Sequence, residues 1–354
     1  MKKILVLGLG KVGSLVGVLL NHKFDVTGAD KEKPHYDFEL PFPVLEVDVT
    51  SDHFLQEILP QYDTVVSALP YFLNKKIAQA SHDVGQHYFD LTEDLETTNF
   101  IRDLGKTSKG VMAPQCGLAP GLIGIVGADL TKEFTKLRDI ELRVGALPRY
   151  PNGLLAYSFT WSPAGVINEY ICDAEAIANG KRKMVPSLQG FEYINIEGQE
   201  FEAFTTSGGL GTMCETYEGK VDTLNYKTIR YPGHGKLMRF LIYELIMKND
   251  TQQLEEILKN AKPPVKEDVV YVYAVVEGWQ EKKVFRNEYF RAFYPIEIDG
   301  KQWRAISWTT AASLAAVVEM VANGSLPNKG FIKQEEIPFN KFLETDNGAY
   351  FREE

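Results

Sequence analysis

A glycine-rich motif near the N-terminus has the residues and the spacing to hold a dinucleotide. It reads "GLGKVG" over residues 8–13, directly after an apolar segment and directly before a helical pattern. In such a motif the first glycine makes a tight turn, the second lets backbone amides approach a pyrophosphate, and the third lets the helix pack on the strand. The unpaired N–H groups of the helix N-terminus then face the phosphates. The cofactor contacts expected here are Gly8, Gly10, Lys11, Val12 and Gly13.

An aspartate further along the chain bears on the choice of cofactor. Asp30 ends the second predicted strand, twenty residues after Gly10, where a carboxylate accepts hydrogen bonds from the adenosine ribose hydroxyls. A carboxylate at this place repels a 2′-phosphate, so the sequence favours NAD over NADP. Lys31 and Lys33 lie beside Asp30 and keep NADP open as an alternative.

Small and polar residues follow the next predicted strands at the same carboxyl edge, where ligands bind in sheets of this type. The end of the third strand is placed to meet the adenine, and a small-residue loop after the fourth could flank the ribose and the nicotinamide. The further cofactor contacts expected are Asp48, Val49, Ala68, Leu69, Pro70, Leu91, Cys116 and Gly117.

The stretch "FDLTED" (89–94) places acidic residues at the end of the fifth strand. Glu93 and Asp94 are therefore candidates for an acid/base group, which must lie within hydrogen-bond reach of the proton that it transfers. A structural alternative stays open. Thr92 could cap the following helix, with Glu93 and Asp94 interacting favourably with the helix dipole.

A second glycine-rich stretch, "MAPQCGLAPGLIGIVG" (112–127), follows the sixth predicted strand. Pro120 precedes an apolar periodic segment and suits the first turn of a helix, so a loop over 115–119 and a helix over 120–130 are predicted. The glycines allow the loop backbone to approach the nicotinamide closely. Cys116 has no neighbouring sequence signal for a nucleophilic role.

Alternating strands and helices must position these residues. Short apolar strands alternate with helical patterns through the first 115 residues, which is typical of a parallel sheet with helices on its faces. The predicted fold of this part is α/β, a doubly wound sheet of the Rossmann type. The strands are predicted over residues 3–9, 24–30, 43–49, 64–70, 87–92 and 110–114.

The alternation stops in the second half, where β-rich segments follow one another with few helices between them. This pattern predicts an α+β domain with a mixed or antiparallel sheet. The local predictions are strands over 139–149 and 154–161, a helix with Ser162 as its N-cap and Pro163 at its first position, and a hairpin at Asn179-Gly180.

An alanine-rich segment over 309–324 predicts a helix that ends at Gly324 and returns to cover the Rossmann sheet. The chain is therefore expected to have three parts. These are a cofactor-binding domain (1–118), an α+β substrate domain that could also dimerise (119–308), and a C-terminal segment packed back on the first domain (309–354).

The composition narrows the partners. A formal net charge of −10 argues against nucleic acid, which needs clustered Lys and Arg. The three cysteines are too few and too scattered for a disulfide framework or a zinc site, so no metal is expected and the composition fits the cytoplasm. No apolar run reaches the roughly 18 residues of a membrane span, so no membrane partner is expected.

Several motifs occur in a characteristic order: "GLGKVG", "VDVT", "SALPYFLN", "YFDLTED", "QCGLAPGL", "TWSPAGVINEY", "FEAFTTSGGLGTM" and "TIRYPGH". In these motifs the chain resembles the saccharopine dehydrogenase family over about residues 1–335, and most of all its compact members, which include the lysine 6-dehydrogenases. The resemblance implies oxidation or reduction at a carbon–nitrogen bond of a lysine-derived amino acid with a nicotinamide cofactor. It also implies a homodimer formed through the sheet of the second domain.

An amino-acid substrate defines the groups to look for. Its carboxylate calls for an arginine, and Arg230 in "TIRYPGH" is the candidate, with Tyr231 beside it. His234 is a candidate proton carrier, with the alternative that it caps backbone groups at a helix start. Further substrate contacts are expected from Tyr71, Trp161, Ser162 and Glu169, although burial in the core is an open alternative for Trp161.

These observations together predict an NAD(P)-dependent oxidoreductase acting on the CH–NH bond of a lysine-type amino acid, with lysine 6-dehydrogenase as the first choice. Saccharopine reductase and a carboxynorspermidine-type reductase are the alternatives within the family. An NAD-binding sensor without catalysis is the alternative from another class.

Overall fold

Two units, each with its own sheet, make up the chain. The computed structural model describes residues 1–33, 36, 38–159, 161–263 and 265–353. The first unit comprises Met1–Ile125 and Ser307–Glu354, and the second comprises Val126–Ile306. Along the chain, helix α4 (Leu122–Thr131) leads from the first unit into the second, and helix α9 (Ala305–Ala322) leads back.

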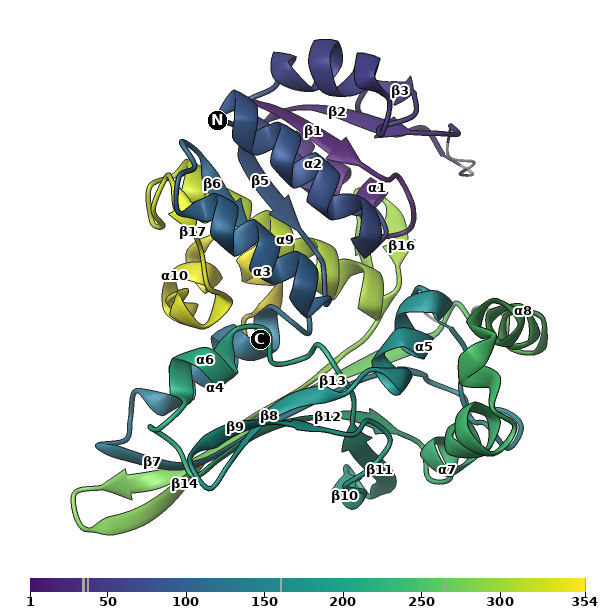
Figure 1. Cartoon of the computed structure of the whole chain (residues 1–354), viewed down its shortest axis with the longest axis vertical. Helices are drawn as coiled ribbons and strands as arrows, with labels where there is room; N and C mark the ends of the chain where they lie inside the picture. Colours follow the sequence, from purple (N-terminus) through teal and green to yellow (C-terminus); the bar gives the residue numbers. More distant parts are fainter. Residues whose placement is uncertain (34–35, 37, 160, 264, 354) are drawn as a thin grey trace. The chain divides into compact units, whose positions relative to one another are not determined.

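A seven-stranded parallel sheet forms the centre of the first unit, in the order β17-β6-β5-β4-β1-β2-β3 (Figure 1). Apart from β17, this is the strand order of a doubly wound dinucleotide fold, so the predicted Rossmann-type sheet is confirmed. Its elements are β1 (Lys3–Leu7), α1 (Gly13–Asn21), β2 (Asp25–Asp30), β3 (Val44–Glu46), β4 (Thr64–Ser67), α2 (Tyr71–Val84), β5 (His87–Asp90), α3 (Leu95–Gly105), β6 (Val111–Ala113), β17 (Gly330–Phe331) and α10 (Phe339–Glu344).

The strands end earlier than the sequence predicted. β3 ends at Glu46 rather than at residue 49, and β4 ends at Ser67 rather than at residue 70. The residues expected to meet the cofactor after these strands therefore lie on the connecting loops.

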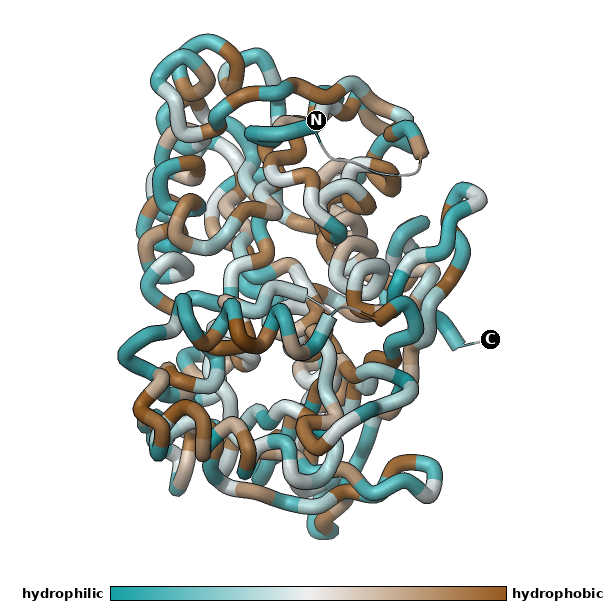
Figure 2. Tube along the Cα trace, turned by 90° about the vertical axis from the view of Figure 1, so that its right-hand side faces the viewer, coloured by the Kyte–Doolittle hydropathy of each residue, from teal (hydrophilic) through white to brown (hydrophobic). Residues whose placement is uncertain are grey.

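The core of the first unit lies between the sheet and its covering helices. Leu5 and Leu7 of β1 and Tyr88 of β5 pack with Ile77 of α2 and Ile101 of α3. Hydrophilic and hydrophobic residues alternate along the helices in Figure 2, as expected where one face of a helix covers a sheet and the other meets water.

The C-terminal segment completes this sheet. β17 pairs in parallel with β6, with Gly330 opposite Val111 and Phe331 opposite Met112. Helix α9 is long and apolar enough to cross a membrane by length and composition, which the sequence reading missed, but 89% of it is buried inside the protein. A buried core helix of a folded domain can have the same length and composition as a membrane span.

The second unit is built on an eight-stranded mixed sheet, in the order β10-β11-β12-β7-β13-β14, with the hairpin β8–β9 attached to β12 (Figure 1). β12 pairs in parallel with β7, and the other pairings are antiparallel. The predicted α+β class is confirmed. The elements are β7 (Lys136–Pro148), α5 (Pro163–Ile171), β8 (Ala174–Ala178), β9 (Lys181–Val185), β10 (Glu192–Ile196), β11 (Gln199–Thr205), α6 (Met213–Tyr217), β12 (Thr223–Arg230), α7 (His234–Arg239), α8 (Thr251–Ala261), β13 (Asp268–Gln280), β14 (Lys283–Phe293), β15 (Ile296–Ile298) and β16 (Lys301–Trp303).

Three local predictions in this unit are confirmed and one is wrong. The strand predicted over 139–149 corresponds to β7. Asn179 and Gly180 form the hairpin turn, both with positive φ, and Ser162 caps α5 with its side chain. The strand predicted over 154–161 is absent from its described residues, because Tyr157 and Phe159 turn into the core instead of alternating along a ladder.

The helix predicted over 120–130 begins two residues later. Pro120 follows a cis peptide bond and lies in a turn, and α4 starts at Leu122. Gly121 has a φ of 135°, which a helical residue does not adopt, so the helix cannot extend back to Pro120.

Candidate functional site

The glycine loop after β1 leaves room for a ligand at one glycine only. A Cβ on Gly8 would lie 2.9 Å from the carbonyl oxygen of Ala68, and one on Gly13 would lie 1.9 Å from that of Gly8. These two glycines allow the chain to pack. A Cβ on Gly10 would meet no atom within 4 Å, so open space lies over the second glycine, where the pyrophosphate of a dinucleotide is expected.

Asp30 at the end of β2 is held against this loop. One carboxylate oxygen accepts a hydrogen bond from Leu9 N at 2.6 Å, and the other accepts one from Lys31 N at 2.7 Å. Tyr36, which the sequence did not single out, donates to Leu9 O at 3.2 Å. The oxygen bonded to Lys31 N also accepts a longer bond from Glu32 N at 3.5 Å, whereas the oxygen bonded to Leu9 N keeps a further acceptor position, so Asp30 can still receive a ribose hydroxyl.

The loops after β3 and β4 differ in how well they fit their predicted roles. Asp48 accepts hydrogen bonds from the backbone and the side chain of Thr50, which lower its pKa, and it remains exposed. Val49 is buried in the core, where it packs with the β1 leucines. Ala68 continues the pairing to Leu7, and Leu69 and Pro70 lead into α2, next to the glycine loop.

At the end of β5, a buried aspartate fixes two loops. The carboxylate of Asp90 accepts hydrogen bonds from the Tyr88 hydroxyl at 2.9 Å, from Thr92 N at 2.9 Å and from Gln115 N at 3.2 Å. Burial raises its pKa to about 6. The motif "FDLTED" contains Asp90. Its hydrogen bond with Gln115 could not be predicted from the motif, because the two residues are 25 positions apart in the sequence.

Glu93 and Asp94 have different surroundings. Asp94, and not Thr92, is the N-cap of α3, because its side chain accepts a hydrogen bond from Thr97 N at 2.7 Å. The alternative that Thr92 caps this helix is therefore wrong. Glu93 is half-buried, and loss of solvent together with the nearby charges of Asp94 and Asp90 raises its pKa to about 7. A carboxyl group with a pKa near neutrality is suited to proton transfer.

The loop that follows β6 is tightly folded. A Cβ on Gly121 would lie 2.0 Å from the carbonyl oxygen of Gly117, and the side chain of Leu91 lies against Gly117. Cys116 is fully buried, and burial raises the pKa of its thiol. The amide of Gln334 donates to Pro114 O at 2.9 Å and to the Cys116 sulfur at 3.4 Å, so the C-terminal segment holds this loop.

In the second unit, Arg230 lies among aromatic side chains. It ends β12, is 3% exposed, and its guanidinium lies 4.8 Å from the centre of the Tyr157 ring. Its Nε donates to the Tyr170 hydroxyl at 2.9 Å and one terminal nitrogen donates to Ile229 O at 2.8 Å. The hydrogen bond to the Tyr170 hydroxyl and the nearby negative charge of Glu169 oppose the desolvation of the guanidinium, and its pKa stays above the ordinary value.

His234 completes this cluster in a defined protonation state. Its Nδ1 lies 3.0 Å from Leu155 O and its Nε2 lies 3.0 Å from the Tyr170 hydroxyl. Because a carbonyl oxygen only accepts, Nδ1 carries the proton. Because Arg230 only donates, the Tyr170 oxygen accepts from it and the phenol proton points to Nε2. Burial and the Arg230 charge lower the pKa of His234 to about 3, so it is neutral near pH 7 and unsuited to the predicted proton-carrier role.

The N-terminus of α7, next to Arg230 in sequence, is already occupied. The buried carboxylate of Glu202 accepts hydrogen bonds from Gly233 N at 2.8 Å and from Gly235 N at 2.6 Å. Glu202 is the register partner of Arg230 between β11 and β12, a relation that the sequence reading missed. Because Glu202 already accepts hydrogen bonds from these N–H groups, a substrate carboxylate would have to bind to Arg230 instead.

The remaining predicted substrate residues are placed as follows. Glu169 and Trp161 are half-buried near the cluster. Burial raises the pKa of Tyr157, and the charge of Glu169 adds to this shift. Ser162 is exposed and accepts from Gly165 N, and Tyr231 donates to Pro148 O at 3.0 Å. In the first unit, Tyr71 begins α2 and packs edge to face on Phe72.

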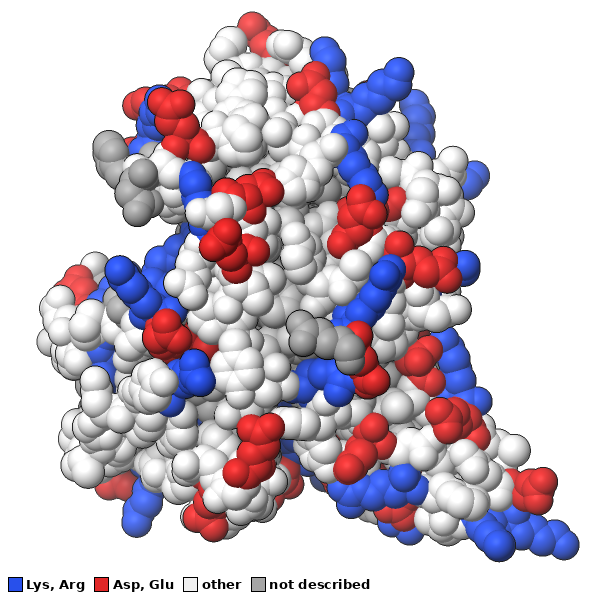
Figure 3. Space-filling view, turned by 180° about the vertical axis from the view of Figure 1, so that it is seen from behind, with Lys and Arg blue, Asp and Glu red and all other residues white. Residues whose placement is uncertain are grey.

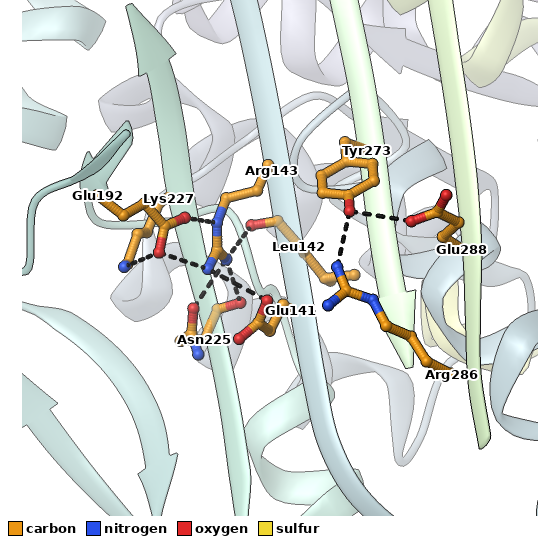
Figure 4. A network of polar contacts seen from close by, with 9 residues as sticks. All are labelled: Glu141, Leu142, Arg143, Glu192, Asn225, Lys227, Tyr273, Arg286 and Glu288. Atoms are coloured by element: carbon orange, nitrogen blue, oxygen red, sulfur yellow. Dashed lines mark hydrogen bonds and ion pairs between the residues drawn. The ribbon is translucent and has the colours of Figure 1, made fainter. Parts of the chain in front are cut away.

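A second buried arginine in this unit is fully paired. Arg143 donates to Glu192 at 2.5 Å and to the Asn225 side chain at 2.8 Å, and Lys227 donates to the same glutamate at 2.5 Å (Figure 4). Both cations share one carboxylate, so this network fits a role in holding β10, β12 and β7 together. Within the described residues, no group of three His, Cys, Asp or Glu side chains could hold a metal ion.

Two family models match this chain. The model of the saccharopine dehydrogenase NADP binding domain matches residues 4–113, and that of the saccharopine dehydrogenase C-terminal domain matches residues 117–346. The first match covers the glycine loop and the second covers the Arg230 cluster.

Curated relatives are distant in sequence. The mitochondrial alpha-aminoadipic semialdehyde synthase of Rattus norvegicus is 25% identical over 281 residues, which is 71% of this chain and 29% of the rat protein. The saccharopine dehydrogenase (NADP(+), L-glutamate-forming) of Saccharomyces cerevisiae is 23% identical over 265 residues, which is 67% of this chain and 58% of the yeast protein. The matched part of the chain is thus less than two thirds of the length of either relative.

Solved structures share the fold. The apo saccharopine dehydrogenase (L-Glu forming) of Saccharomyces cerevisiae superposes with a TM-score of 0.77 at 16% identity, covering 99% of this chain and 98% of its own. The homospermidine synthase of Legionella pneumophila, in complex with NAD, superposes with a TM-score of 0.68 at 14% identity, covering 97% and 88%.

Proposed function

The chain belongs to the saccharopine dehydrogenase family of NAD(P)-dependent oxidoreductases, and we propose that it is a lysine 6-dehydrogenase. In this reaction a hydride leaves the carbon that bears the side-chain amine of lysine, the nitrogen loses a proton, and the resulting imine is hydrolysed or cyclises. Saccharopine dehydrogenase is the second candidate, because relatives of that name match most of this chain.

The observation that carries the proposal is the buried Arg230. Its bonds to Tyr170 and Ile229 leave donor capacity on the guanidinium, since arginine has five N–H groups. A buried charge of this kind is stabilised by a carboxylate that it can hydrogen-bond. Arg230 therefore binds the α-carboxylate of the substrate. One such arginine suits lysine, which has one carboxylate, better than saccharopine, which has three.

Tyr170 and His234 position this arginine. The chain of hydrogen bonds from Arg230 through Tyr170 to His234 ends on a backbone carbonyl, and neutrality of the imidazole keeps a second positive charge away from the guanidinium. His234 thus acts through Tyr170 and not by transferring a proton. Glu169, with its negative charge near the same cluster, binds the substrate ammonium, and Trp161, Ser162, Tyr231 and Tyr71 remain predicted substrate contacts.

The cofactor supplies the hydride acceptor. Gly10 with the amides of Lys11, Val12 and Gly13 would hold the pyrophosphate, and Asp30 the ribose hydroxyls. Because Asp30 repels a 2′-phosphate, NAD is the proposed cofactor and NADP the alternative. The other predicted contacts, at Asp48, Val49, Ala68, Leu69, Pro70, Leu91, Cys116 and Gly117, remain proposals, of which Val49 and Cys116 are the weakest because both side chains are buried.

Glu93 is the proposed acid/base group. Its raised pKa lets it accept a proton near neutral pH and return it to water, whereas the carboxylate of Asp94 is engaged in capping α3. We therefore prefer Glu93 to Asp94 and His234 among the three predicted catalytic residues.

The proposal is tested by following NADH fluorescence with purified protein and a panel of lysine, saccharopine and related amino acids. Turnover of NAD on lysine without 2-oxoglutarate supports lysine 6-dehydrogenase. Turnover on saccharopine alone replaces it with the second candidate. Tight NAD binding without turnover on any substrate would indicate a sensor and overturn the enzymatic proposal.

We further propose a cytoplasmic homodimer that has neither nucleic acid nor a membrane as its partner. The three cysteines, all among the described residues, form no disulfide with one another, which suits a reducing compartment. On the face shown in Figure 3, acidic and basic side chains are interspersed, without the extended basic stripe that a phosphate backbone needs.

A further inference from the structure

One buried hydroxyl beside Arg230 has no hydrogen-bond partner. Tyr157 is 1% exposed, and among the residues that the structure describes no group lies in hydrogen-bonding geometry with its hydroxyl. Burying a hydroxyl without a hydrogen bond costs free energy, because the group loses its bonds to water. Unpaired buried groups are uncommon in folded proteins, so this hydroxyl needs an explanation.

The groups around Tyr157 cannot receive its phenol proton. The guanidinium of Arg230 lies 4.8 Å from the centre of the Tyr157 ring, but it has only donors. The ring of His234 lies 5.0 Å away, and its Nε2 already faces the hydroxyl of Tyr170. Burial raises the pKa of Tyr157, and the indole N–H of Trp161 opposes this shift as a donor, so it cannot accept the proton either.

Tyr170 has the same neighbours but a fully used hydroxyl. Its oxygen accepts from Nε of Arg230 at 2.9 Å, and its proton points to Nε2 of His234 at 3.0 Å. Two buried tyrosines thus pack on the same arginine and the same histidine, and only Tyr170 finds its partners within the protein. Folding alone does not explain the hydroxyl of Tyr157, since a phenylalanine would fill the same space.

Arg230 has unused donors in the same place. It uses Nε for Tyr170 and Nη1 for Ile229, which leaves the two N–H groups of Nη2 for a ligand. The Tyr157 hydroxyl is carried by the ring that lies against this guanidinium, so both donors are close enough for the two oxygens of one carboxylate. A water molecule could accept from the hydroxyl, but it would not compensate the buried positive charge.

We propose that Tyr157 is a substrate-binding residue whose hydroxyl donates to one oxygen of the substrate α-carboxylate while Arg230 donates to the other. This rests on the proposed function and adds a second donor to it. Hydrogen bonds to a charged acceptor are stronger than neutral ones, so the carboxylate gains from both contacts.

The pair of donors also predicts which substrates are rejected. A diamine such as cadaverine is lysine without its carboxylate, and in the site it would leave both donors buried and unpaired. Sites that hydrogen-bond a substrate group discriminate strongly against analogues that lack it. The site should therefore select amino acids and exclude simple diamines.

Thermal unfolding of the full chain without ligand separates a binding role from a structural one. Tyr157→Phe keeps the ring on Arg230 and removes an unpaired hydroxyl, so the Tm should stay within about 1 °C or rise. Tyr170→Phe is the matched control. It removes a hydroxyl with two hydrogen bonds and should lower the Tm by at least about 2 °C. An equal loss in both variants would give the Tyr157 hydroxyl a structural role and overturn the proposal.

Calorimetric titration in the presence of NADH measures binding without turnover. Tyr157→Phe should raise the Kd for L-lysine at least about tenfold, as expected for a lost hydrogen bond to a charged group. The Kd values for cadaverine and for NADH should be the same in the variant and the wild type. An unchanged Kd for L-lysine, or an equal loss of affinity for cadaverine, contradicts the proposal.

A double-mutant cycle shows whether the two residues hold the same group. If Tyr157 and Arg230 bind one carboxylate, the double variant Tyr157→Phe/Arg230→Lys should lose less L-lysine affinity than the product of the two single losses. Single losses that simply multiply would mean that the two side chains act on different parts of the ligand, and the shared carboxylate would be refuted.

The proposed function and this inference can fail separately. If the wild type turns over saccharopine and not lysine, the proposed reaction is replaced, and the same titrations with saccharopine test Tyr157. If the wild type turns over lysine and Tyr157→Phe binds it with unchanged affinity, only this inference is wrong. A wild type that binds neither amino acid would refute both.

Discussion

The guanidinium of Arg230 lies over the ring of Tyr157, 4.8 Å from its centre, at a position that is 3% exposed. A cation over an aromatic face gains electrostatic energy, and more so away from water. Together with the hydrogen bond to Tyr170, this contact keeps the charge in the core without a carboxylate bonded to it among the described residues. A site of this kind is ready to receive a carboxylate from outside.

Replacement of Arg230 should affect the amino acid and spare the cofactor. Arg230→Lys keeps the charge but loses the planar donor fork, so we expect the KM for lysine to rise about 10- to 100-fold, as for the loss of hydrogen bonds to a charged group. The KM for NAD should change less than about threefold. Steady-state kinetics with either substrate varied give both values. Equal effects on both would mean that the carboxylate site is misplaced.

Replacement of His234 should change how stability depends on pH. The pKa of about 3 in the folded protein lies below the ordinary 6.5, so protons bind preferentially to the unfolded chain. This destabilises the native state as pH falls below about 6.5, by about 1.4 kcal/mol for each pH unit. His234→Asn keeps a donor for Leu155 O and should remove this slope. Urea unfolding of both proteins between pH 4.5 and 7.5 measures the difference, and parallel curves would contradict a neutral buried His234.

Two acids, the buried Asp90 and the half-buried Glu93, act in the opposite direction. The pKa values of Asp90 and Glu93 are raised, so each favours the native state at low pH and loses this contribution as pH rises through about 6 and about 7. Both groups are present in the wild type and in the His234 variant. The comparison between the two proteins therefore isolates the histidine.

Glu93→Gln should remove an ionisation from the rate profile. With a pKa of about 7, Glu93 becomes a base as the pH rises, so kcat/KM of the wild type should increase through this range. The variant should lose about 100-fold or more in kcat and lack this step, while its Kd for NAD stays unchanged. Glu96→Gln, in the first turn of α3 three residues after Glu93 but exposed and paired with Lys75, is the control and should behave as the wild type. Retention of the step in Glu93→Gln would assign it to another group.

Asp30→Asn should weaken NAD binding and narrow its advantage over NADP. The amide loses the charge that repels a 2′-phosphate, although it keeps an oxygen that can accept from Leu9 N. Fluorescence titrations with NADH and NADPH give the two Kd values, whose ratio should move towards one. Asp25→Asn, at the other end of β2 and exposed, should leave the ratio as it is. An unaltered ratio of the two Kd values in Asp30→Asn would show that this carboxylate does not bind the ribose hydroxyls.

Substitutions in the glycine loop can separate effects on NAD binding from effects on the stability of the fold. At Gly10 a methyl group meets open space, so Gly10→Ala should cost less than about 1 kcal/mol of stability but reduce NAD affinity at least tenfold by occupying the pyrophosphate position. Gly13→Ala places the methyl 1.9 Å from a carbonyl oxygen and should destabilise the fold itself. Thermal unfolding with and without NADH distinguishes the two. A stable Gly10→Ala that binds NADH normally would refute the assignment of the loop.

The fold class could be predicted because its signals are local. Strand and helix patterns, the glycine spacing and the cap at Ser162 each lie within a few residues, and the strand order followed from the doubly wound type. The strand expected at 154–161 failed for the opposite reason. Tyr157 and Phe159 are apolar at alternate positions, but Tyr157 is buried against the distant residues Arg230 and His234, and Phe159 packs on Tyr157.

The candidate site could be predicted only in part. Arg230 and His234 could be named as candidates because an arginine and a histidine occur together in the motif "TIRYPGH". Tyr170, which joins them, lies 60 and 64 residues away, and the capping role of Glu202 spans 31 and 33 residues. Hydrogen bonds over such separations depend on the register of the mixed sheet. No spacing rule in the sequence gives that register, so the protonation state of His234 could not be inferred either.

The pairing of β17 with β6 has a consequence for how the protein is made. Gln334 reaches back 220 residues to the loop after β6, and the whole second unit is synthesised in between. During synthesis on the ribosome, the outer edge of β6 therefore stays unpaired until residues 330–331 of β17 have emerged. A nascent chain stalled before residue 330 would expose this edge to its neighbours, which makes the order of synthesis, and not only the final contacts, a determinant of whether the sheet closes.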